Sequence, residues 1–214
     1  YQCKELLRVC QCIALEVNGE VSAINQQIAN NALSVKNRVI NPFPQANNLE
    51  QNASAFLKDA KMFIQTLAEM FEILFGEKVK GPRFDKVKNI LLKRFGKENE
   101  LYNYVARNEP YIQQIVDSRN RIEHPSEDER FVINNYTLLP QNQIRPPVWF
   151  LTGQEPRPIA EQMNQLVEGL LTFAEEFFIL CIFEQKDDWI PYVITEIPET
   201  VPLGIVLLNV TFKD

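Results

Sequence analysis

Apolar residues recur at spacings of three and four along most of the chain, which is the period of an amphipathic helix. The first such stretch, residues 2–38, predicts one long helix or two helices broken near Gly19, and the proline-rich residues 42–44 end it. Further helices are predicted over residues 49–75, closed by Gly76, and over residues 84–95, closed by Gly96. The core-facing positions expected in the first helix are Leu6, Val9, Ile13, Val17, Val21, Ile24 and Ile28.

Two more helices follow in the second half of the chain. One begins near Glu98, and Pro110 is expected to break or kink it, because proline supplies no backbone N–H donor. Its second part, residues 109–123, carries apolar side chains at helical spacing. The last helix is predicted over residues 158–183.

Between and after these helices the pattern changes to that of strands. Residues 131–138 and 147–151 predict two short strands, and residues 189–196 and 205–212 predict two more. Four short strands suffice for one small antiparallel sheet. The sequence therefore predicts a mainly α protein, a four- to five-helix bundle with a small antiparallel β addition.

The domain organisation follows from the same pattern. We interpret residues 1–185 as one helical domain with a β-hairpin insertion at about residues 126–157. Residues 186–214 are expected to form a C-terminal β segment that packs on this domain. The length of 214 residues and the apolar fraction of 45% fit a globular protein with a sizeable core.

Composition excludes several classes of site. No apolar run reaches the roughly 18–20 residues of a membrane span, and the N-terminus lacks the basic-then-apolar pattern of a signal peptide. The four cysteines form no Cys-x-x-Cys unit, and the chain has one histidine, so we expect reduced thiols and no metal or other cofactor. These features favour a cytoplasmic protein that does not bind a membrane. The cysteines are Cys3, Cys10, Cys12 and Cys181.

Charge is unevenly distributed in a chain whose net charge is −6. Residues 78–97 contain eight basic residues and one acidic residue. This stretch is compatible with a local phosphate-binding face, but a solvated helix surface is the more ordinary interpretation, since lysines commonly cover exposed helices. The candidate RNA-binding residues are Lys86, Lys88, Lys93 and Arg94.

The single histidine, His124, limits the enzymatic options. The chain has no Gly-x-Ser-x-Gly elbow and no phosphate-cradling glycine loop. Arg119 lies five residues earlier, about 140° away around an ideal helix, but Pro125 disfavours helical geometry at His124. The helix is therefore expected to end here, which allows the imidazole to turn toward Arg119.

A guanidinium beside a histidine suits metal-free RNA cleavage. The histidine can exchange protons with a 2′-hydroxyl or with the leaving oxygen, and the arginine can neutralise charge on the phosphate in the transition state. Asn120 can orient the phosphate or the histidine through its amide. The alternative interpretation is a histidine that caps the helix or lies on the surface.

The run Ser118-Arg119-Asn120-Arg121-Ile122-Glu123-His124-Pro125 resembles the signature of the HEPN superfamily. That signature is an arginine, a polar residue directly after it, and a histidine four to six residues beyond the arginine. It stands at the end of a late helix in a four- or five-helix bundle, with a further helix after it. The resemblance covers roughly residues 1–125 and 156–185 as architecture, and eight residues as motif.

The resemblance implies a metal-independent endoribonuclease, often a homodimer whose two motifs face each other. It implies catalytic roles for Arg119 and His124 and a supporting role for Asn120. Such domains are common in toxin–antitoxin and phage-defence systems, so RNA, an antitoxin or a nucleotidyltransferase are the expected partners. The insertion after His124 and the acidic net charge depart from the family pattern.

Two alternatives stay open. One is a non-catalytic helical module that binds a protein or a nucleotide. The other is an accessory protein that binds single-stranded nucleic acid through its basic stretch.

Overall fold

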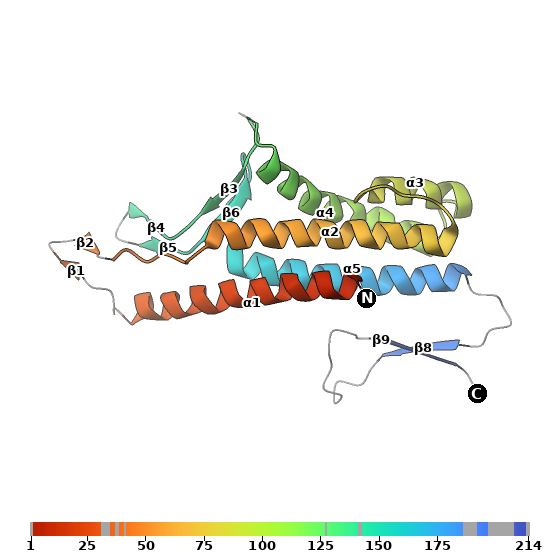
Figure 1. Cartoon of the computed structure of the whole chain (residues 1–214), viewed down its shortest axis with the longest axis horizontal. Coiled ribbons are helices and arrows are strands. Elements are labelled where there is room, and N and C mark those ends of the chain that lie inside the picture. The colour runs from red at the N-terminus through yellow and green to blue at the C-terminus, as the bar shows by residue number, and fades with distance from the viewer. Residues whose placement is uncertain are drawn as a thin grey trace. The chain divides into compact units, whose positions relative to one another are not determined.

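The computed structural model describes residues 2–30, 35–36, 39–40, 42–126, 128–140, 143–185, 192–196 and 208–212. Within these ranges the protein is mainly helical, and small antiparallel sheets are inserted between the fourth and fifth helices (Figure 1). The predicted fold class is confirmed. The five helices of the described ranges are α1 (Gln2–Ala29), α2 (Leu49–Phe75), α3 (Phe84–Phe95), α4 (Glu100–Glu123) and α5 (Ile159–Gln185).

Local signals set the ends of the middle helices. Gly76 and Gly96 follow α2 and α3 with φ of 71° and 85°, a region that glycine enters without the strain of a Cβ atom. The side chain of Asn99 accepts a hydrogen bond from the backbone N–H of Tyr102 at 3.0 Å, which caps the first turn of α4. The bounds predicted for α2 and α3 are therefore confirmed.

Helix α1 is the single long helix of the two predicted alternatives, because it runs through Gly19 without a break. It ends at Ala29 rather than near residue 38, and residues 35–36 form a strand instead. Its buried side chains are centred one residue away from several of the predicted positions. Val9 is 41% exposed, whereas Cys10 is fully buried and its Sγ donates a hydrogen bond to the carbonyl of Phe56 at 3.7 Å. Small residues are among those buried here, and a pattern based on large apolar residues misses them. The buried residues of α1 are Leu7, Cys10, Ala14, Val17 and Val21.

Helix α4 continues through Pro110, so a break, the first of the two predicted effects of this proline (a break or a kink), is wrong. Pro110 is exposed, and proline in a helix interior removes one intrahelical hydrogen bond. The amide of Asn108 donates a hydrogen bond to the carbonyl of Tyr104 at 2.9 Å, just before the proline. Buried side chains on both sides of Pro110, among them Val105 and Ile112, hold the helix against the core.

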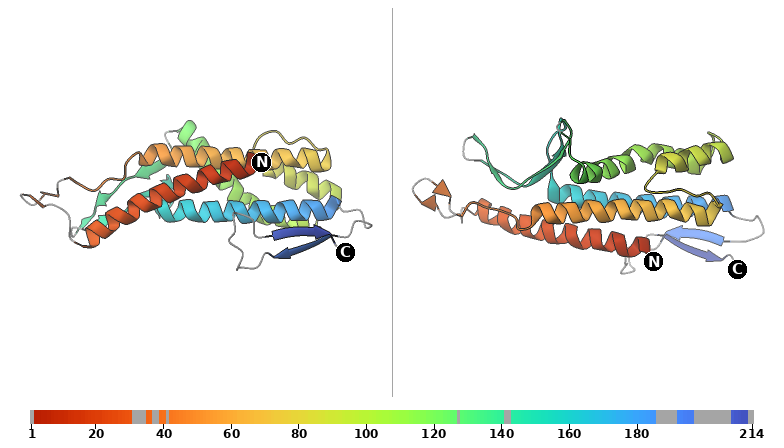
Figure 2. Two further views of the ribbon diagram at one scale, coloured as in Figure 1. Left: turned by 60° about the horizontal axis from the view of Figure 1, so that its bottom comes forward. Right: turned by 45° about the horizontal axis from the view of Figure 1, so that its top comes forward.

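The strands form separate small antiparallel sheets, so the prediction of one four-stranded sheet is wrong. Each strand pairs with a near neighbour in the chain, because short connections favour hairpins. One sheet has the order β3 (Phe131–Asn134), β6 (Val148–Leu151), β7 (Arg157–Pro158). The others pair β1 (Val35–Lys36) with β2 (Val39–Ile40), β4 (Thr137–Leu138) with β5 (Ile144–Arg145), and β8 (Tyr192–Glu196) with β9 (Leu208–Phe212) (Figure 2). The remaining residues of the two predicted tail strands lie outside the described ranges.

The chain divides into two compact units whose boundaries fall inside α2, α4 and α5. Unit 1 comprises Tyr1–Phe63 and Gln114–Val167, and unit 2 comprises Ile64–Gln113 and Glu168–Asp214. In unit 1, Trp149 of β6 packs on Phe56 and on Phe131, with ring centroids 6.1 Å and 5.5 Å apart. The core of unit 2 contains an aromatic cluster of Phe84, Tyr104, Phe173 and Phe177. None of the described helices is both long enough and apolar enough to cross a lipid bilayer.

Candidate functional site at the end of helix α4

The residues of the predicted motif occupy the last turn of α4 and the residue after it, all within unit 1. The helix ends at Glu123, as the position of Pro125 predicts, and the backbone N–H of His124 still donates to the carbonyl of Asn120 at 2.8 Å. The turn before the motif is buried, and Ser118 donates its hydroxyl to the carbonyl of Gln114. The core therefore fixes the position of the motif.

Arg119 is held by a carboxylate of its own helix. Its Nη2 lies 2.6 Å from Oε1 of Glu123, one turn later, and only 11% of its side chain is exposed. Its Nε is buried and has no hydrogen-bond partner. An arginine fork has five N–H donors, so the guanidinium keeps unused capacity for an anion beyond the Glu123 contact.

Lys61 reaches this turn from α2. Its Nζ donates to Oδ1 of Asn120 at 2.8 Å and lies 3.4 Å from Oε2 of Glu123. The two oxygens of Glu123 thus contact two cations from different helices. The carboxylate orients both cations, and at the same time it offsets their charge.

Sequence reasoning missed Lys61. It lies 59 residues before Asn120, in the middle of a helix of ordinary composition. Its spacing from Phe56 and Phe63 places it on the rim of the buried face of α2, and one lysine at such a rim position is unremarkable. Only the pairing of α2 with α4 shows what it contacts.

His124 is exposed just past the helix end, and within the described part of the chain its side chain forms no hydrogen bond or ion pair. Its imidazole therefore forms no hydrogen bond with Arg119, although the two residues stand at the same helix end. The chain turns directly after it, where the hydroxyl of Ser126 accepts from the N–H of Glu129 at 3.0 Å. An ion pair between Arg121 and Glu129 fastens this turn to α4.

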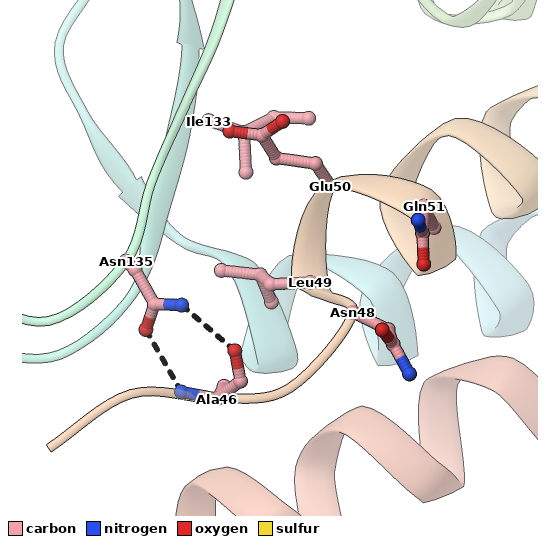
Figure 3. Close-up of a pocket in the computed structure, with 7 residues that line it drawn as sticks. All are labelled: Ala46, Asn48, Leu49, Glu50, Gln51, Ile133 and Asn135. Atoms are coloured by element: carbon pink, nitrogen blue, oxygen red, sulfur yellow. Dashed lines mark hydrogen bonds between the residues drawn. The ribbon is translucent and has the colours of Figure 1, made fainter.

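The insertion that follows is anchored to the N-terminal half of unit 1. The side-chain amide of Asn135 accepts from the N–H of Ala46 at 2.9 Å and donates to the carbonyl of Ala46 at 2.8 Å (Figure 3). The hydroxyl of Tyr136 bonds the carbonyl of Val21 at 3.1 Å and the side chain of Asn25 at 2.9 Å. These contacts fix the strands to α1 and to the chain before α2.

A pocket of about 260 Å³ opens beside this anchor, between the start of α2 and the insertion (Figure 3). The motif residues do not line it. Its lining residues are Ala46, Asn48, Leu49, Glu50, Gln51, Ile133 and Asn135.

The predicted RNA-binding lysines and arginine lie on α3, in unit 2, and only two of the four have free charges. Lys88 is paired with Glu109 at 2.8 Å, and the guanidinium of Arg94 stacks on Phe75 while donating to its carbonyl at 3.0 Å. Lys86 and Lys93 are exposed and form no hydrogen bond or ion pair with any described residue. Seven residues apart, they share one face of the helix.

No group of three or more histidine, cysteine, aspartate or glutamate side chains is placed to hold a metal ion anywhere in the described ranges. Comparison with known proteins gives no match to a family model, to a curated protein or to a solved structure.

Proposed function

We propose that this protein is a metal-independent endoribonuclease of the HEPN type, and that the last turn of α4 with His124 is its active site. The observation that carries the proposal is the placement of three motif residues at one helix end. Arg119 and Asn120 are held by neighbouring side chains, and the imidazole of His124 is free in solvent beside them. His124 is the group that exchanges protons, and Arg119 is the group that stabilises the phosphate.

Asn120 holds a supporting position in this proposal. Its carboxamide oxygen accepts from Lys61, and its amide nitrogen is left to contact a phosphate or a ribose hydroxyl. The substrate is RNA rather than DNA, because the reaction needs a 2′-hydroxyl next to the scissile phosphate.

The enzyme acts as a homodimer in this proposal. Arg119 and His124 form no hydrogen bond with each other within one chain, and a second copy of the motif supplies the partner for each. Sedimentation equilibrium is expected to give twice the mass of one chain. A monomer at concentrations at which RNA is cleaved contradicts this part of the proposal.

The experiment compares degradation of a labelled single-stranded RNA in EDTA by the wild type and by three variants. Arg119→Ala and His124→Ala are each expected to reduce the cleavage rate by about 10²–10⁴-fold, the range of a lost acid–base or oxyanion-stabilising group. Arg121→Ala is the matched control, since Arg121 lies in the same run but pairs with Glu129. Cleavage that survives both of the first two substitutions, or that needs added metal, overturns the proposal.

The contact of Arg119 with Glu123 favours a second candidate, a non-catalytic module with the same fold. An arginine that is nearly buried and paired at 2.6 Å serves to hold the end of α4 in place. This function predicts that the wild type cleaves no RNA and that Arg119→Ala lowers the melting temperature, which thermal unfolding measures.

A further inference from the structure

We propose that Lys61 of α2 is a phosphate-binding residue of this site, and that the carboxylate of Glu123 occupies the place of a phosphate between Lys61 and Arg119. The substrate side of this inference rests on the proposed function, because the phosphate is taken to belong to RNA. The binding side rests on geometry alone.

The first step is the arrangement of charges around Glu123. Its Oε1 lies 2.6 Å from Nη2 of Arg119, and its Oε2 lies 3.4 Å from Nζ of Lys61. Two cations from two helices thus converge on one pair of anionic oxygens. A phosphate offers oxygens of the same charge sign at a comparable separation, so it fits the same two donors.

The second step concerns what holds the cations when Glu123 moves away. Arg119 is 11% exposed and Lys61 is 26% exposed, so packing confines both side chains. Lys61 also keeps its 2.8 Å hydrogen bond to Asn120, which does not involve Glu123. The cations are therefore preorganised for an anion, and this reduces the entropy lost on binding.

The third step is the mobility of the carboxylate. Glu123 is the last residue of α4, and 37% of its side chain is exposed. Rotation of this side chain into solvent releases both cations without disturbing the core. Glu123 then acts as an internal competitor of the phosphate, so its charge sets the affinity of the site.

The test measures binding rather than cleavage. The probes are inorganic phosphate and a short single-stranded RNA, both titrated against full-length protein, and RNA is titrated in the His124→Ala background to prevent turnover. Glu123→Gln is expected to bind both probes about fivefold more tightly, the effect of removing one partly exposed charge. Glu129→Gln is the matched control, because Glu129 is paired with Arg121 and contacts neither cation of the site.

Lys61→Gln is expected to weaken binding of both probes about fivefold while keeping a donor for Asn120. With RNA it also reduces the slope of log affinity against log salt by about 0.7, the value of one lost phosphate contact on a single strand. Lys58→Gln, an exposed lysine one turn earlier on α2, is the matched control. Lys61→Arg restores the charge and is expected to recover most of the affinity.

Thermal unfolding of each variant confirms that it is folded. If Lys61→Gln does not fold, Lys61→Arg still tests the inference. The inference is overturned if Lys61→Gln binds as Lys58→Gln does, if the arginine variant binds no better than the glutamine variant, or if Glu123→Gln binds no more tightly than Glu129→Gln. The proposed function fails separately. If phosphate binding depends on Lys61 but the protein cleaves no RNA, the anion site is supported and the proposed ribonuclease activity is contradicted.

Discussion

The hydroxyl oxygen of Tyr111 on α4 lies 2.5 Å from the position that a Cβ atom would occupy at Gly169 on α5. Replacing a glycine inside a helix with alanine usually raises the free energy of unfolding, by up to about 1 kcal/mol. Here the aromatic ring fills the space, so Gly169→Ala is expected to lower the free energy of unfolding by about 1–3 kcal/mol, the usual cost of overpacking. Chemical denaturation measures this value.

Gly19 provides the matched control for that substitution. It also lies inside a long helix, but nothing stands within 4 Å of a Cβ atom there. Gly19→Ala is therefore expected to raise the free energy of unfolding by up to about 1 kcal/mol. Equal effects of the two substitutions would show that the contact of Tyr111 with Gly169 does not constrain α5.

The paired hydrogen bonds of Asn135 to Ala46 give a second prediction. Asn135→Ala leaves both backbone groups of Ala46, a buried residue, without these partners. The expected loss is about 1–3 kcal/mol in the free energy of unfolding. Asn134→Ala is the control, because this neighbour has no side-chain hydrogen bond within the described residues.

Two buried thiols predict a loss of stability in alkali. Burial, with a smaller contribution from Asp59, raises the pKa of Cys10 from 9.0 to about 12, and burial, with a smaller contribution from Glu184, raises that of Cys181 to about 12. As the pH rises, the unfolded chain loses these two protons at a lower pH than the folded protein does. The stability that the protonated thiols contribute is therefore complete below about pH 9 and is lost as the pH rises toward 12.

Each thiol is expected to contribute up to about 1.4 kcal/mol per pH unit to the decline. Denaturation at pH 8.5 to 10 reports mainly on this effect. Burial also raises the pKa of Tyr104, Tyr111 and Tyr136 from 10.0, but in the unfolded chain these phenols ionise substantially only from about pH 10 upward. Replacing both cysteines with alanine is expected to flatten the slope. If the slope does not change, groups other than these two thiols cause the loss of stability in alkali.

The basic helix α3 gives a prediction that separates binding from stability. Lys86→Glu and Lys93→Glu are expected to weaken RNA binding and its salt dependence with little effect on the melting temperature. Lys88→Glu places a second carboxylate against Glu109 and is expected to destabilise the protein by about 1 kcal/mol or more. Filter binding at two salt concentrations, with thermal unfolding of the same variants, distinguishes the two classes.

Helix bounds could be predicted where the chain carries a strong local signal. Gly76 and Gly96 end α2 and α3, and Pro125 ends α4. Pro110 does not break α4, because packing on both sides of it outweighs the loss of one hydrogen bond. The buried face of α1 differs from its prediction because Cys10 and Ala14, which are buried, are too small to contribute to a pattern of large apolar residues.

Long-range partners could not be predicted in the same way. The sequence places Arg119, Asn120 and His124 at one helix end, and the structure agrees with that placement. The contact of Lys61 with Asn120 depends on how two helices pack, and no local pattern carries that information. The possible single sheet of four strands is wrong for the same reason, since strand pairing depends on the connecting loops and on the packing of the core.

The anchor of the insertion has a consequence for how the chain folds. Asn135 and Ala46 are 89 residues apart in the chain, and Tyr136 and Val21 are 115 apart. Contacts of such high sequence separation form slowly, because a large loop must close before any contact is gained. During synthesis α1 leaves the ribosome long before the segment beyond His124 exists. The hydrogen bonds of Asn135 and Tyr136 that anchor this segment are therefore expected to be among the last to form, both on the ribosome and in refolding.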